Sequence, residues 1–285
     1  MWVDALSVTL RALSFVALFQ AAGMAMFIAL FGHELSRVEY LVRRYGVISA
    51  LVASALVLGH YALEAARMSG DFAGISDATL QSLVLHSSSS VALTWRLSGL
   101  VLIAVGLRTR SVPGITLGVV GATLAVGAFT LTGHTAAHPQ RWLLSVLLLG
   151  HLLVVAFWFG ALVPLHFASS REPAAVAGKV IDGFSRLAVW LVPGLFVAGV
   201  VLAIVLVKHL SGLATAYGQM LIVKLAGFAL LMLLAALNKW RLGPAIARGE
   251  ASASRAFRRS LAAEYLLIGA VLTVTAALTT FFSPE

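Results

Sequence analysis

Three histidines lie in one short stretch of the chain, Gly133–Gly160. His134 and His138 belong to a polar turn, whereas His151 lies in a run apolar enough to be buried in a membrane. At 1.5 Å per residue, His151 is roughly 12 Å along a helix from Trp142. An imidazole at that depth is costly without a partner and marks a functional site by default. The alternative for His151 is a structural bond to a carbonyl of a neighbouring helix.

Two more histidines extend this set. His60 lies about a turn from the end of an apolar run, and His86 precedes four serines. Imidazole nitrogens suit copper, zinc or iron, and we expect His60, His134, His138 and His151 to converge at one mouth of a helix bundle. The chain has no cysteine, so a thiolate site is excluded. The alternative for His134 and His138 is a pair of solvated loop histidines, because a proline after His138 disfavours helix there.

Methionine thioethers could extend a path for a soft metal, although methionine usually fills apolar cores. The candidates are Met24, Met26, Met220 and Met232. A further set of polar side chains lies inside apolar runs, and its charged members are Arg11, Arg96, Lys224 and Glu264. We expect Glu264 to meet Lys239 or an arginine of a nearby loop, and Lys224 and Arg96 to snorkel toward the membrane surface.

The composition indicates an integral membrane protein. Of 285 residues, 60% are hydrophobic and 11% charged, and the mean hydropathy is +0.98. A net charge of +9 could indicate a protein that binds nucleic acid. Basic residues in short loops between membrane spans instead set the orientation of the spans in the membrane. We therefore expect no nucleic-acid partner and a chain whose main partner is lipid.

About 20 apolar residues are needed to cross a bilayer as a helix. We predict an all-α, polytopic helix bundle, a single integral membrane domain over residues 1–285, with eight spans at roughly 6–30, 45–65, 91–107, 113–132, 142–165, 187–207, 219–238 and 261–282. The loops after the odd-numbered spans hold 14 of the 20 Lys and Arg residues. The positive-inside rule therefore places both termini outside.

Two connections have their own features. Asp77 can N-cap a short helix lying on the membrane, and the Ala, Ser and Arg rich segment Gly243–Arg259 is expected to be a mobile loop. Small residues such as Gly118, Gly121 and Ala125 favour close helix contacts, either within one chain or in a homo-oligomer.

A series of short motifs, dense from Gly133 onward, resembles the copper resistance protein D family of bacterial inner-membrane proteins. The residues that carry the resemblance are Gly133 with His134; His151, Leu152, Ala156, Trp158 and Gly160; Phe184, Ser185 and Arg186; Tyr217, Gly218 and Gln219 with Lys224; Asn238, Arg241 and Pro244; and Glu264. Where the family often has a histidine after the arginine of span one, this chain has Ser14. Where it often has a Thr and Gly pair before span three, this chain has His86 and four serines.

The resemblance implies an eight-helix protein of the inner membrane that moves copper, beside a small periplasmic copper-binding protein of the C type. It implies His134 and His151 as ligands, with Trp158 and Gly160 shaping the packing around them. We expect an importer that does no covalent chemistry and is not an enzyme. Two alternatives remain open: a haem-bearing electron carrier with paired axial histidines, and a membrane partner of a copper carrier that transports nothing itself.

Overall fold

The computed structural model describes residues 2–133, 138–207 and 215–281, and this part of the chain consists of helices and connecting turns without strands. Eight segments in it are long and apolar enough to cross a membrane, which confirms the predicted all-α polytopic bundle. The long helices are α1 (Trp2–Phe31), α2 (Glu39–Ala62), α5 (Ser88–Arg108), α6 (Val112–Gly127), α8 (Arg141–Arg171), α9 (Ala174–Val207), α10 (Ala216–Leu237) and α12 (Ala251–Phe281). The short elements are η1 (Gly32–Glu34), α3 (Glu64–Ser69), η2 (Phe72–Ser76), α4 (Ala78–Leu85), η3 (Ala128–Leu131), the π-helical η5 (Asn238–Leu242) and α11 (Gly243–Ala247).

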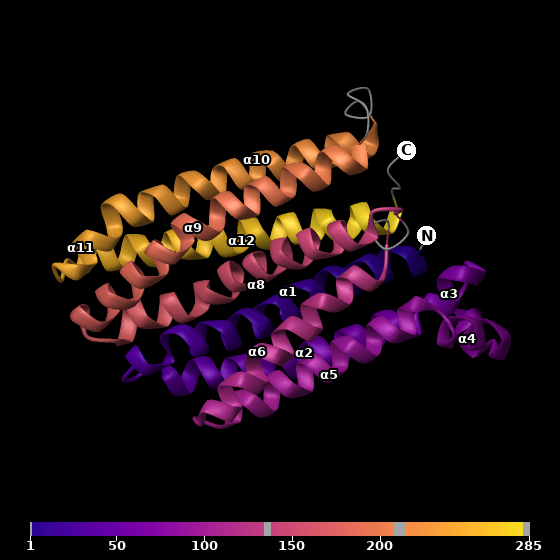
Figure 1. Cartoon of the computed structure of the whole chain (residues 1–285), viewed down its shortest axis with the longest axis horizontal. Helices are drawn as coiled ribbons and strands as arrows, with labels where there is room; N and C mark the ends of the chain where they lie inside the picture. Colours follow the sequence, from indigo (N-terminus) through magenta and orange to yellow (C-terminus); the bar gives the residue numbers. More distant parts are fainter. Residues whose placement is uncertain (1, 134–137, 208–214, 282–285) are drawn as a thin grey trace.

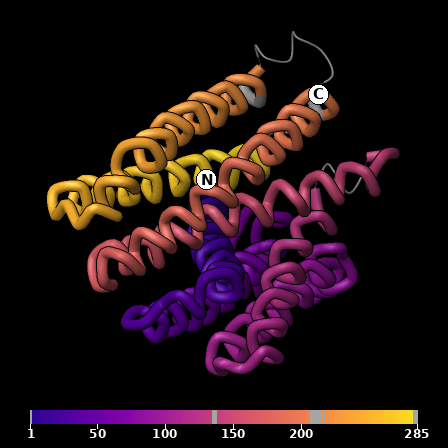
Figure 2. Tube along the Cα trace, turned by 60° about the vertical axis from the view of Figure 1, so that its left-hand side comes forward, coloured from indigo at the N-terminus to yellow at the C-terminus, as the bar shows by residue number. Residues whose placement is uncertain are grey.

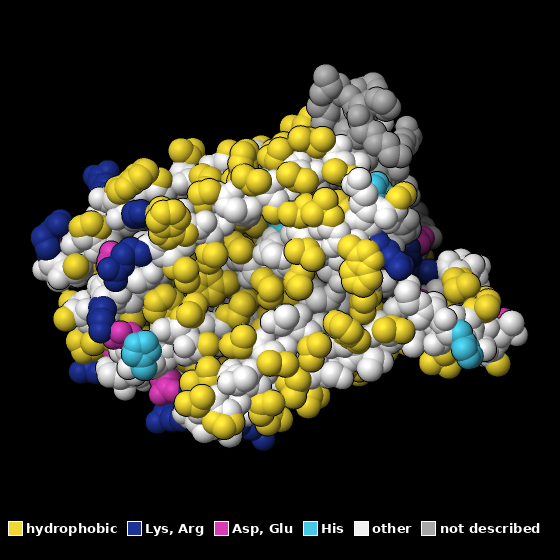
Figure 3. Space-filling model, viewed as in Figure 1, with side chains coloured by type: hydrophobic (Ala, Val, Ile, Leu, Met, Phe, Trp, Pro, Cys, Tyr) yellow, Lys and Arg dark blue, Asp and Glu magenta, His cyan; other side chains and the backbone are white. Residues whose placement is uncertain are grey.

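Helix α1 is the centre of the bundle. It contacts α2, α5 and α6 on one side and α8 and α12 on the other, and Figures 1 and 2 show it enclosed between these two groups. Helices α9 and α10 lie at the periphery, where α9 packs on α8 and α10 on α12. Their large apolar side chains remain exposed, as at Trp190 and Leu233. In Figure 3 such side chains cover the length of the bundle, as expected of a lipid-facing surface.

The backbones of α1 and α8 touch where the two helices cross. A Cβ on Gly23 would lie 1.9 Å from the carbonyl oxygen of Ala156, and one on Gly160 would lie 2.4 Å from the Cα of Gly23. Gln20 Nε2 donates a hydrogen bond to the Gly160 carbonyl at 3.1 Å. Only glycine on both helices permits this approach, which brings the second half of the chain against the first.

Helices α5 and α6 make a similar contact. A Cβ on Gly99 would lie 2.5 Å from the carbonyl oxygen of Gly121, and one on Gly106 would lie 2.6 Å from the amide of Gly118. The predicted small-residue contacts of Gly118 and Gly121 are therefore made within the chain.

The two ends of the bundle differ in charge. We call the end where α1 begins and α12 ends the terminal end, and the opposite end the basic end. Figure 1 shows α3 and α4 at the terminal end and α11 at the basic end. In Figure 3 most Lys and Arg side chains of the visible face gather at the basic end. The placement of the basic end in the cytoplasm remains a prediction from the positive-inside rule.

Two connections can be compared with the sequence-based expectations. Asp77 caps α4, since its Oδ1 accepts hydrogen bonds from the amides of Thr79 and Leu80 at 2.8 and 3.0 Å. The expectation of a mobile loop over Gly243–Arg259 is wrong. The segment forms α11 and the first turns of α12, joined at Gly249 with a φ of +81°. Its alanines and arginines favour helix, and buried Phe257 anchors it to the core.

Glu172 ties the α8–α9 turn to the turn before α2 at the basic end. Its carboxylate accepts hydrogen bonds from the Ser36 hydroxyl at 2.6 Å and from the amides of Ser36, Arg37 and Val38 at 3.0, 2.7 and 3.0 Å. Partial burial by itself would raise the pKa of Glu172. These four bonds to the charged form outweigh that effect and hold the pKa below its ordinary value.

Candidate functional site

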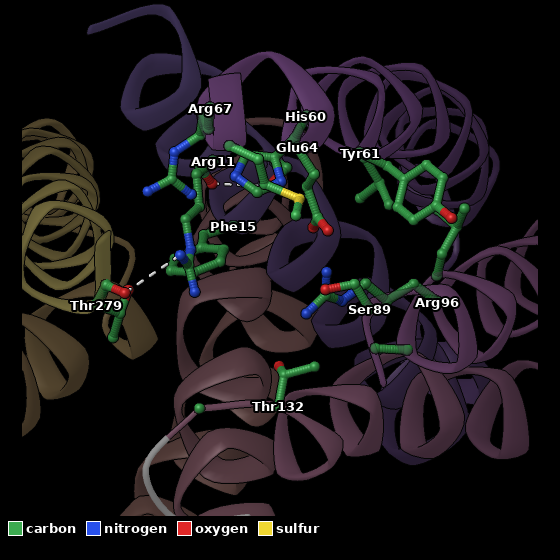
Figure 4. Close-up of a pocket in the computed structure, with 16 residues that line it drawn as sticks. Arg11, Phe15, His60, Tyr61, Glu64, Arg67, Ser89, Arg96, Thr132 and Thr279 are labelled. Atoms are coloured by element: carbon green, nitrogen blue, oxygen red, sulfur yellow. Dashed lines mark hydrogen bonds between the residues drawn. The ribbon is translucent and has the colours of Figure 1, made fainter. Parts of the chain in front are cut away.

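A polar cavity of about 440 Å³ opens among the helices at the terminal end (Figure 4). Its walls come from α1, the junction of α2 and α3, α5 and α12, together with Thr132 and Gly133 after η3. The interior of a membrane-spanning bundle is mostly filled with apolar side chains. A cavity with charged walls inside such a bundle is therefore the first candidate for a ligand-binding site.

His60 supplies an imidazole to this cavity. Its Nε2 is buried and has no hydrogen-bond partner in the described part of the chain. Glu64 and Met68 follow at intervals of four residues and also line the cavity. Because α3 begins two residues after α2 ends, this spacing places the three side chains on one side of the helix path.

Three arginines surround the same space. Arg11 Nη1 donates to the Thr279 carbonyl at 3.4 Å and to the Thr280 hydroxyl at 3.3 Å, which supplies the partners that the sequence left unknown. The guanidinium of Arg96 lies 4.7 Å from the centre of the Phe129 ring, and Arg67 completes the set. Arg96 Nε is buried beside the cavity, and the snorkelling of this side chain to the membrane surface stays a prediction.

Glu64 is the one carboxylate among the residues that line the described cavity. The positive charges of Arg96, Arg11 and Arg67 act on its carboxylate. Figure 4 shows Glu64 and Arg96 reaching into the cavity from opposite walls. The site thus combines one imidazole, one thioether and one carboxylate with three guanidinium groups.

His151 lies elsewhere, at the contact of α8 with α9. Its Nδ1 is 3.2 Å from the Leu195 carbonyl oxygen, and its ring faces Gly199. Lys224 of α10 is close enough for its charge to act on the imidazole, and it is half-buried. The bond to Leu195 is the structural contact that the sequence left open as an alternative to a metal-binding role.

Two further candidate histidines, His86 and His138, lie in turns at the terminal end. His86 Nδ1 is 2.7 Å from the Ser82 carbonyl oxygen of its own helix, and His138 Nδ1 accepts from the Gln140 amide at 3.1 Å. His134 lies outside the described residues. Of the four histidines expected to converge, the structure places only His60 at the cavity among the three it describes.

The candidate methionines occupy two helices and do not line the cavity. Met24 is buried in α1 against Gly46, and Met26 of the same helix packs on the core. Met232 packs on the core from α10, while Met220 near the start of that helix is half-buried. Within residues 2–133, 138–207 and 215–281, no three His, Cys, Asp or Glu side chains are grouped closely enough to hold a metal ion.

A second polar cluster lies toward the basic end. Glu264 of α12 is 2% exposed and accepts hydrogen bonds from Trp158 Nε1 at 3.2 Å and from Asn238 Nδ2 at 2.5 Å. The expectation that Glu264 pairs with Lys239 or with a loop arginine is wrong. Asn238 begins the π-helical turn and is buried with its amide toward Glu264, whereas the next residue, Lys239, is half-buried.

Sequence reasoning missed Glu64, Arg67 and Met68 as cavity residues. The signal that could have found them is the repeat of His60, Glu64 and Met68 every four residues. The predicted second span ended at residue 65, so that Glu64 lay at its end and Met68 in the connection beyond it, and the repeat was not recognised as one helical face.

The family model described as "Copper resistance protein D-like, N-terminal domain" matches residues 2–141, and that described as "Copper resistance protein D" matches residues 178–278. A "Copper resistance protein D" from Pseudomonas syringae pv. tomato is 30% identical over 314 residues, covering 99% of this chain and 98% of that protein. No solved structure matches. The chain therefore belongs to the copper resistance protein D family.

Proposed function

We propose that this protein serves copper resistance by moving copper across the bacterial inner membrane, with the terminal end on the periplasmic side. Copper is the substrate and undergoes no covalent chemistry, so the protein is a permease and not an enzyme. Membership of the copper resistance protein D family supports the metal. The distribution of basic residues supports the orientation.

One observation carries the proposal: an unpartnered imidazole nitrogen, His60 Nε2, lies at a cavity that Met68 also lines. Imidazole and thioether together bind both oxidation states of copper and favour it over harder cations. Two or three ligands make a site weak enough to release the ion, as transport requires. His60 and Met68 would hold the ion, with Glu64 as the nearest carboxylate.

The direction of movement follows from the same placement. The cavity lies at the end that the positive-inside rule assigns to the periplasm, where a small copper-binding protein of the C type could deliver the metal. An outward-facing uptake site supports import. The close crossing of α1 and α8 at Gly23 and Gly160 lies further along both helices, and the Glu264 cluster contacts α8 at Trp158.

The first test measures copper bound by the detergent-purified protein, by elemental analysis and calorimetry. The native chain should bind copper, and His60→Ala should weaken binding at least about tenfold, the effect of losing one ligand worth about 1.4 kcal/mol. His86→Ala is the matched control, since His86 lies in an exposed turn and bonds its own helix. Equal binding by the native chain and His60→Ala would refute the assignment.

An absorption spectrum of the same samples separates copper from haem. An intense Soret band lost in His60→Ala would make this a haem protein and overturn the copper proposal. The third reading, a membrane partner that transports nothing, predicts copper binding without flux in reconstituted vesicles.

A further inference from the structure

The cavity at the terminal end is strongly cationic for a site that would take a metal cation. We call Arg11, Arg67 and Arg96 the arginine cluster. These side chains carry three positive charges against the single carboxylate of Glu64, a net of about +2 with His60 neutral. Like charges this close in a partly buried space repel one another far more strongly than they do in water. A bare copper ion would meet this repulsion on reaching His60.

The arginine cluster also contains unmet hydrogen-bond donors. Arg67 Nε and Arg96 Nε are both buried without a partner in the described part of the chain. A guanidinium has donors only and stays charged. A group that meets these donors must be an acceptor, and negative charge on it would also offset the charge of the cluster.

Glu64 does not fill this role. Its carboxylate lies at the cavity, and no ion pair within 4 Å joins it to the arginine cluster in the described residues. One carboxylate also leaves two charges of the cluster uncompensated. Arg11 is turned toward Thr279 and the end of α12, as Figure 4 shows. The three guanidinium groups thus border a shared space from α1, α3 and α5.

We propose that the cavity binds a small oxyanion, a carboxylate or phosphate group, held by the arginine cluster. Guanidinium groups pair with both groups through parallel hydrogen bonds. A cavity of about 440 Å³ has room for an anion of several carboxylates. The bound anion neutralises the cluster, so that a cation can approach His60 with the anion or after it.

This inference goes beyond the proposed function, because it depends on the charges and unmet donors of the cavity and holds whether or not copper enters. The oxyanion has two sources with the same chemistry: a free anion such as citrate or phosphate, and the phosphate headgroup of an anionic lipid. Both are small enough to enter the cavity at the terminal end.

The test measures anion binding in the absence of copper. Purified native protein is titrated with citrate and with inorganic phosphate by calorimetry, and its thermal stability is compared in nanodiscs of phosphatidylcholine with and without phosphatidylglycerol. The variants are Arg96→Gln and Arg67→Gln. The matched control is Arg141→Gln, which removes an exposed arginine that stacks on Trp142 at the same end of the bundle.

Loss of one charged donor should weaken oxyanion binding about tenfold or more in either variant and leave Arg141→Gln unchanged. Binding of citrate or phosphate with this pattern identifies a free anion. Stabilisation by phosphatidylglycerol alone, lost in Arg96→Gln and Arg67→Gln, identifies a lipid headgroup. If neither source binds the native protein, or if the control loses as much affinity as both variants, the proposal fails. Because two variants are measured, the test still gives a result if one of them does not fold.

Discussion

The crossing of α1 and α8 can be tested with a single methyl group. A Cβ on Gly160 would lie 2.4 Å from the Cα of Gly23, whereas carbon atoms in contact prefer about 3.5–4.0 Å. Because the neighbour is backbone, Gly160→Ala must push the helices apart. Overpacking of this kind costs about 1–3 kcal/mol. The displacement would also strain the hydrogen bond from Gln20 to the Gly160 carbonyl.

The matched control is Gly150→Ala in the same helix, where a Cβ would meet nothing within 4 Å. Both substitutions replace glycine by alanine in α8, so the gain in helix propensity of up to about 1 kcal/mol cancels in the comparison. Thermal unfolding in one detergent, followed by tryptophan fluorescence, should give Gly160→Ala the lower midpoint, by about 2–4 °C per kcal/mol. Equal midpoints for the two variants would show that the backbones do not touch at this crossing.

Three further predictions concern polar contacts. Trp158→Phe removes the indole donor to Glu264 and should lower the free energy of unfolding by about 0.6–1.7 kcal/mol. Its control is Trp190→Phe, which changes an exposed tryptophan. An equal loss of stability in both variants would contradict the buried hydrogen bond. Glu172→Gln tests pH dependence: since the folded pKa lies below the unfolded value of about 4.3, the native carboxylate stabilises fully above pH 4.3 and progressively less as pH falls through the folded pKa. The native melting midpoint should therefore exceed that of Glu172→Gln at pH 7 and approach it in acid, and a constant difference would refute the bonding. His151→Ala should weaken the α8–α9 contact through loss of the Leu195 bond but leave copper binding at the cavity unchanged, whereas abolished copper binding would make His151 a ligand.

The helical spans could be predicted because each is a run of about 20 apolar residues. Their extensions beyond the membrane could not, as α12 illustrates. Its first turns over Ala251–Arg259 hold three arginines and read as a loop, yet buried Phe257 and the helix propensity of alanine make them helical. Burial of one aromatic residue in the core thus stabilises a helix in a segment whose composition alone indicated a mobile loop.

The candidate sites were predictable residue by residue but not as groups. The sequence identified three of the cavity residues singly, as polar residues in or near apolar runs: Arg11, Arg96 and His60. The structure brings them to one cavity. Hydropathy gives the depth of a residue along its helix, but not the direction its side chain faces. For the same reason Glu264 was expected to pair with a loop cation, and its contacts with Trp158 and Asn238 depend on helix rotation and on a π-helical turn.

The most direct test of the central claim is copper flux into vesicles reconstituted with the purified protein, comparing the native chain, His60→Ala and His86→Ala. If copper passes through the terminal-end cavity, the native chain and His86→Ala should accumulate copper inside the vesicles, and His60→Ala should accumulate about tenfold less or none. Native flux in His60→Ala, inserted to the same level, would contradict the claim.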